Sequence, residues 1–93
     1  MEFVWDEEKA AANREKHKVS FEEGQTVFDD GDALLIADPD HSEDEDRFVL
    51  LGMSSVCRML VVCHCYRESD ERIRIISARK ATRTESAMYT RRK

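Results

Sequence analysis

The spacing of apolar and polar residues predicts two helices near the start of the chain. Glu7–Lys16 is rich in Ala, Glu and Lys, which favours a helix, and Asp6 can cap its first turn. Ser20–Glu23 reads Ser-Phe-Glu-Glu and matches a capping box, so a second helix is predicted from there to about Phe28. Phe3–Trp5 precedes both helices and predicts a short first strand or an extended arm.

Short apolar runs bounded by turn residues predict strands in the rest of the chain. The predicted strands are Ala33–Ala37, Arg47–Met53, Met59–Tyr66 and Arg72–Ile75. The last of them alternates Arg with Ile, which is typical of a half-buried strand. If Ile73 and Ile75 face the core, Arg72 and Arg74 share the opposite face. A final helix is predicted from Ala81 onward.

Turns and exposed segments fill the intervals between these elements. Turns are predicted at 29–32, 52–57 and 68–71. Residues 38–46 hold six acidic residues in nine positions and predict an exposed connection, and 91–93 predict a frayed basic tail.

Strands grouped after two helices favour an α+β fold: a small, mainly antiparallel sheet with helices packed on one face and the other face open. A length of 93 residues predicts a single domain, 1–93. A domain of this size has a modest core, so a surface groove suits it better than a deep pocket.

Several classes of protein find no support in the sequence. No apolar run is long enough to span a membrane, and the first residues do not form a signal peptide. The three cysteines are an odd number, so we expect a cytoplasmic protein without a disulfide framework. Neither a Gly-rich phosphate loop nor a Gly-x-Ser-x-Gly elbow is present.

The net charge of −5 hides a strong asymmetry. Residues 1–46 hold sixteen acidic residues against four Lys or Arg, a net charge of −12, whereas residues 47–93 hold four against eleven, a net charge of +7. The basic half is a candidate binder of phosphate. Charge alone leaves open the alternative that the two halves neutralise each other across the fold.

Candidate chemistry gathers at three places, each with a simpler alternative. Arg74 and the Arg79-Lys80 pair could grip phosphate, or be solvated charges facing the acidic half. His17 follows a stripe of Lys9, Asn13 and Lys16 on one helical face, which could line a groove, or merely place cations at a helix end.

The third place is the Cys63-His64-Cys65 run. Its spacing is wrong for zinc, and alternation along a strand would point His64 away from both cysteines. We therefore predict core residues and no metal site.

In combination these residues resemble the BrnT-type ribonuclease toxins of type II toxin–antitoxin systems, over nearly the whole chain. The resemblance rests most on Lys16-His17-x-Val19-Ser20-Phe21 and on Ile76-Ser77-Ala78-Arg79-Lys80-Ala81. It implies a RelE-like fold, RNA cleavage without a metal or other cofactor, and growth arrest. It also implies a hetero-oligomer with a BrnA-like antitoxin that carries a DNA-binding domain. Two positions depart from the family: Lys18 stands where Gly is usual, and Ser86 where a basic residue is common.

The roles that this resemblance suggests define our candidate site. The predicted catalytic set contains a base or acid, three phosphate clamps, and a tyrosine that donates a proton or stacks on a base: His17, Arg47, Arg74, Arg79 and Tyr89. The predicted RNA-binding set is Lys9, Asn13, Lys16, Lys80 and Arg83. The alternative is a catalytically silent module that binds the antitoxin or acts as a co-repressor.

Overall fold

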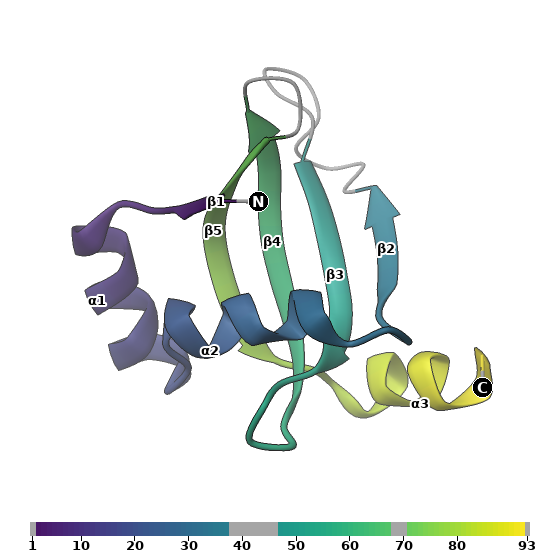
Figure 1. Cartoon of the computed structure of the whole chain (residues 1–93). Helices are drawn as coiled ribbons and strands as arrows, with labels where there is room; N and C mark the ends of the chain where they lie inside the picture. Colours follow the sequence, from purple (N-terminus) through teal and green to yellow (C-terminus); the bar gives the residue numbers. More distant parts are fainter. Residues whose placement is uncertain (1, 38–46, 68–70, 93) are drawn as a thin grey trace.

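The computed structural model describes residues 2–37, 47–67 and 71–92 (Figure 1). The predicted connection at 38–46 and most of the turn at 68–71 lie outside these residues. In chain order the described elements are β1 (Glu2–Val4), α1 (Glu7–His17), α2 (Phe21–Thr26), the 3₁₀ helix η1 (Val27–Asp29), β2 (Leu34–Ala37), β3 (Arg47–Met53), β4 (Met59–Arg67), β5 (Arg72–Lys80) and α3 (Arg83–Arg92).

The described strands form one sheet in the order β1-β5-β4-β3-β2. The strands from β2 to β5 are an antiparallel meander, and β1 is added parallel to β5. The α+β class and the mainly antiparallel sheet are therefore confirmed. Phe3 of β1 pairs with Ile73 of β5, so the start of the chain forms the edge strand beside β5.

Helices α1 and α2 cover one face of this sheet, which we call the helical face. Ala10 of α1 and Phe21 of α2 are buried in one cluster with Leu50, Val62 and Ile75 of the sheet. Phe21 and Val62 are fully buried, so this contact is the main core. Of the three consecutive alanines in α1 only Ala10 is buried, because neighbouring positions on a helix point in different directions.

The third helix differs from our expectation of helices on one face. Tyr89 of α3 is buried in a second cluster with Leu51 and Val61. These two residues are the sequence neighbours of Leu50 and Val62, and successive strand residues point to opposite faces. Helix α3 therefore covers part of the face opposite α1 and α2.

Local sequence signals explain where the first two helices begin. The side chain of Asp6 accepts hydrogen bonds from the backbone N–H groups of Glu8 (2.8 Å) and Lys9 (3.3 Å). The Ser20 hydroxyl accepts one from the Glu23 N–H at 3.0 Å. Both caps were predicted from the sequence and satisfy N–H groups that a helix leaves without partners.

The end of α1 explains why glycine is usual after the Lys-His pair. Lys18 adopts φ 61° and ψ 31°, the left-handed conformation, and its N–H donates to the Arg14 carbonyl. This conformation is strained for a residue with a Cβ atom. The turn after α1 therefore has the backbone conformation that favours glycine, although its residue is Lys18.

Strand β5 extends further than its alternating segment. It continues through a bulge opposite Cys63 and His64 to Lys80, so Arg79 and Lys80 are its last two residues, just before the connection to α3. Among the described residues, no helix has the length and apolar character needed to cross a membrane.

Candidate functional site: a cationic sheet face

Arginine side chains gather on the sheet face opposite α1 and α2. Alternation along β3, β4 and β5 places on this side the five residues that we call the arginine face: Arg47, Arg67, Arg72, Arg74 and Arg79. Arg47, Arg67, Arg72 and Arg74 are each an odd number of residues from the buried Leu50, Val62 or Ile75 of the same strand, and Arg79, which follows the β5 bulge, is next to the buried Ala78. The structure thus brings together three of the predicted phosphate clamps, which are far apart in the sequence.

The centre of this face has a simple arrangement. Arg47 pairs with Cys65, and Cys65 pairs with Arg74 on the far side, so a buried thiol lies between two arginines. Neighbouring strands are about 4.8 Å apart, which separates the two arginine backbones by roughly 10 Å. In the described part of the chain no ion pair joins Arg74 to a carboxylate. A phosphate lying over Cys65 could be reached from both sides.

Arg79 lies at the other end of the face and is held by α3. Its two terminal nitrogens donate to the two carboxylate oxygens of Glu85, each at 2.9 Å. Glu85 also completes a capping box, since it accepts from the Thr82 N–H at 2.8 Å while the Thr82 hydroxyl accepts from the Glu85 N–H at 3.1 Å. The Arg79 hydrogen bonds, against partial burial, lower the pKa of Glu85 to about 2. Arg79 therefore anchors the helix in this state.

Tyr89 is also occupied within the fold. Its ring is buried beside Leu51 and Val61, and its hydroxyl donates to the Asp30 carboxylate at 2.8 Å. The same carboxylate oxygen accepts from the Met53 N–H at 2.8 Å. Asp30 therefore joins η1, β3 and α3, and Tyr89 attaches α3 to the sheet.

Asn13 is a buried residue and not part of an exposed polar stripe. Its amide nitrogen donates to the carbonyls of Val19 (2.9 Å) and Ala78 (2.8 Å), and its amide oxygen accepts from the Ala78 N–H (3.2 Å). These bonds connect α1, the α1–α2 turn and β5. A single buried side chain satisfies three backbone groups, which indicates a structural role.

The other predicted residues of α1 are not brought to the arginine face. Lys9 and Lys16 are exposed and His17 is half-buried. All three belong to a helix whose Ala10 packs into the cluster of the helical face. Lys80, whose strand partner is Leu60, also lies on that side, and Arg83 is exposed at the first residue of α3.

The Cys63-His64-Cys65 run alternates across the sheet, as predicted. His64 is fully buried on the helical face, where its ring lies 4.8 Å from that of Phe28. Its Nδ1 donates to the Val62 carbonyl at 3.1 Å, and burial lowers its pKa. Within the described ranges, no group of three or more His, Cys, Asp or Glu residues could hold a metal ion.

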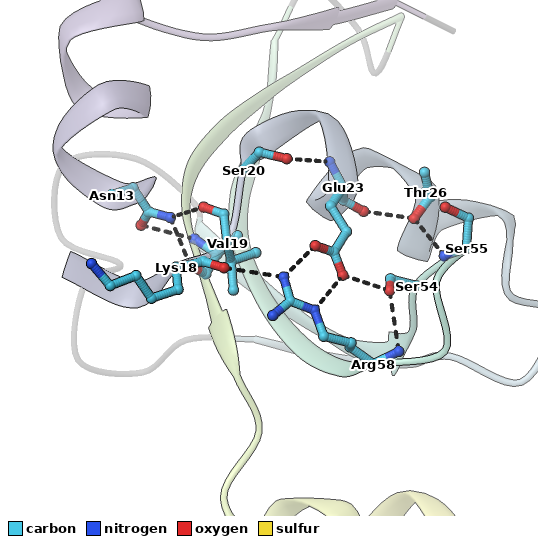
Figure 2. A network of polar contacts seen from close by, with 10 residues as sticks. Asn13, Lys18, Val19, Ser20, Glu23, Thr26, Ser54, Ser55 and Arg58 are labelled. Atoms are coloured by element: carbon cyan, nitrogen blue, oxygen red, sulfur yellow. Dashed lines mark hydrogen bonds and ion pairs between the residues drawn. The ribbon is translucent and has the colours of Figure 1, made fainter. Parts of the chain in front are cut away.

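A polar network on the helical side was missed in the sequence (Figure 2). The Arg58 side chain makes a bidentate contact with Glu23, including Nε to Oε2 at 2.9 Å, and donates to the Lys18 carbonyl at 3.1 Å. Ser54 donates to Glu23 at 2.7 Å. The Arg58 hydrogen bonds hold the pKa of Glu23 below its ordinary value. The network attaches the β3–β4 turn to α2; the only hint in the sequence is one arginine in that turn.

One depression of the surface is unsuited to RNA. It has a volume of about 300 Å³ and carries two carboxylates, and its lining residues are Thr26, Asp29, Asp30, Met53, Ser54 and Ser55. Negative charge there would repel phosphate. The arginine face is therefore the better candidate for an RNA surface.

The fold and the arginine face define a small α+β protein with a cationic sheet surface. A family model described as "Ribonuclease toxin, BrnT, of type II toxin-antitoxin system" matches residues 5–85. The chain belongs to this family, which confirms the predicted resemblance.

A solved structure gives independent support for the fold. The crystal structure of the Brucella abortus ribonuclease toxin BrnT is similar to this chain with a TM-score of 0.67. The two are 22% identical, over 89% of this chain and 99% of that one, so the likeness shows the fold. No match was found among curated proteins. The likeness to RelE-type ribonucleases stays a prediction.

Proposed function

We propose that this chain is a cytoplasmic endoribonuclease toxin of one domain, 1–93, and that it binds RNA on the arginine face. Family membership supports the ribonuclease class. The observation that carries the location is the Arg47–Cys65–Arg74 row, where two arginines flank an uncharged, buried floor. This row can hold one phosphate of an RNA backbone from both sides.

The proposed reaction is an internal transesterification. The ribose 2′-oxygen loses its proton to water and attacks the adjacent phosphorus, and the P–O5′ bond breaks as the 5′-oxygen takes up a proton. The products are a 2′,3′-cyclic phosphate and a 5′-hydroxyl. Arg47 and Arg74 stabilise the charge that develops on the phosphoryl oxygens, and they align the strand. Since arginine stays protonated, its role is electrostatic, and no metal ion is required.

The proposed partner is a BrnA-like antitoxin with a DNA-binding domain, forming a hetero-oligomer with the toxin. Membership of a type II toxin–antitoxin family supports a protein antitoxin. Neutralisation follows directly if the antitoxin covers the arginine face, since the same cations cannot then reach RNA.

The second candidate function is a silent module that only binds the antitoxin. Two predicted catalytic side chains favour it, because Arg79 is engaged by Glu85 and Tyr89 by Asp30. Induced expression without the antitoxin separates the two functions. Growth arrest with RNA fragments supports the enzyme, and normal growth supports the module.

Cleavage of a defined RNA by the purified chain tests the proposal directly. The reaction is run in chelator, and fragment ends are identified by mass spectrometry. We expect fragments with 2′,3′-cyclic phosphate ends. Absence of cleavage, or cleavage that needs a divalent metal, would overturn the proposal.

A further inference from the structure

The arginine face contains an unfavourable pair that the proposed reaction does not use. Arg67, at the end of β4, lies directly opposite Arg72, at the start of β5. Like charges directly opposite on antiparallel strands destabilise a sheet. The Arg72 Nε donates to Glu2 at 2.7 Å, with both side chains well exposed. In the described part of the chain no ion pair joins Arg67 to a carboxylate.

The position of this pair relates it to the central row. Arg67 is two residues beyond Cys65 on β4, and Arg72 is two residues before Arg74 on β5. Two residues along a strand advance about 6.6 to 6.8 Å. The same alternation puts both rows on one face. The distance between the two rows is therefore comparable to the length of one nucleotide in an extended single strand. Each row carries guanidinium groups.

We propose that Arg67 and Arg72 form a second phosphate subsite, which binds the phosphate next to the one held by Arg47 and Arg74. The proposal rests on the proposed function for the identity of the ligand as single-stranded RNA. Guanidinium groups suit this task because each offers a fork of donors that matches two phosphate oxygens. A phosphate between them would offset the repulsion between two guanidinium groups that face each other across the strands.

The subsite has a consequence for substrate length. A dinucleoside monophosphate has one phosphate, so it fills the central row and leaves Arg67 without a ligand. A pentanucleotide reaches both rows. Arg67 should therefore affect binding of the longer strand alone, and raise KM without changing kcat when it is lost.

The test compares Arg67→Ala with Arg14→Ala, an exposed arginine of α1 that lies in neither row. Binding of a non-cleavable 2′-deoxy pentanucleotide and of a deoxy-dinucleotide is measured by fluorescence anisotropy at several salt concentrations. We expect Arg67→Ala to weaken pentanucleotide binding about tenfold and to reduce the magnitude of the slope of log K against log salt by about 0.7. Dinucleotide binding should stay at the wild-type value, since its single phosphate lies in the central row. The melting temperature should not fall, since the Arg67 side chain is exposed.

Two outcomes keep this inference separate from the proposed function. If Arg67→Ala behaves like Arg14→Ala with the pentanucleotide, the subsite is wrong, even if the wild-type chain cleaves RNA. If the wild-type chain binds the pentanucleotide but cleaves no RNA, the proposed function fails, while the changed salt slope of Arg67→Ala still supports the subsite. An Arg67→Lys variant that restores the wild-type slope of log K against log salt would support a charge contact between residue 67 and phosphate. A variant whose slope and affinity both stay at the Arg67→Ala values would overturn that contact.

Discussion

The two faces of the sheet are built from the same three strands and differ in what occupies alternate positions. On the helical face, Leu50, Val62 and Ile75 are buried under α1 and α2, and the buried Asn13 amide there is hydrogen-bonded. On the other face, arginines alternate with these residues, and α3 covers one end through Tyr89. The comparison teaches that one face can supply stability while the other retains charge that would be costly in a core.

The largest expected effect on stability falls on the helical face. Asn13→Ala should leave the carbonyls of Val19 and Ala78 and the Ala78 N–H without their partner, at a cost of about 3 kcal/mol or more. Urea unfolding measures it. Asn13 was predicted to bind RNA, so RNA affinity at a temperature where the variant remains folded is the control. Loss of affinity with unchanged stability would show that the helical face also binds RNA.

The next effect concerns the attachment of α3 to the arginine face. The folded-state pKa of Glu85 is about 2, below its ordinary value of 4.5, so its ion pair with Arg79 contributes fully above about pH 4.5 and is lost as pH falls toward 2. We expect about 1–2 kcal/mol less stability for Glu85→Gln at pH 7, after allowance for the exposure of both side chains.

Unfolding of wild type and Glu85→Gln between pH 7 and pH 2.5 provides the check. The two curves should converge at the acid end. Curves that remain parallel would mean that the pKa of Glu85 does not differ between the folded and unfolded states. The Arg79–Glu85 ion pair would then not be a structural anchor.

A smaller effect separates the two possible roles of Tyr89. Tyr89→Phe keeps the buried ring and removes one hydrogen bond to Asp30, which should cost about 1 kcal/mol. Because that hydroxyl is engaged, RNA cleavage should stay within a few fold of wild type. A fall in cleavage of two orders of magnitude with unchanged stability would instead make Tyr89 a proton donor.

The smallest expected effect is an increase in the free energy of unfolding. Lys18→Gly should relieve the left-handed conformation at the end of α1 and raise stability by about 0.5–1 kcal/mol. Lys16→Gly, which lies within the helix, is the matched control and should lower stability. Destabilisation by Lys18→Gly would show that contacts of the lysine side chain outweigh the backbone strain.

The sequence contained enough information to predict most of the helices and strands and to place Arg74 on one face of the sheet. Capping residues and alternation are local signals, so Asp6, Ser20 and the Arg72–Ile75 pattern indicated the correct structures. The same alternation correctly separated His64 from Cys63 and Cys65. Arg74 was placed on the correct face because its neighbours Ile73 and Ile75 are apolar.

Features that depend on long-range packing could not be predicted in this way. The helical spacing of Asn13 with Lys9 and Lys16 suggested an exposed stripe, but only the approach of β5 shows that Asn13 is buried. The partners of Arg79 and Tyr89 depend on α3 packing opposite α1 and α2. Arg67 became a candidate only through its register with Arg72, which no local pattern contains.

The most direct test of the account compares one residue from each side of the sheet. RNA cleavage in chelator is measured for Arg74→Ala, from the arginine face, and for His17→Ala, from α1, after both are shown to be folded. If the arginine face is the active surface, Arg74→Ala should lose cleavage by about 100-fold or more, while His17→Ala stays within a few fold of wild type. Cleavage abolished by His17→Ala and retained by Arg74→Ala would place the active site on the side of α1 and contradict the account.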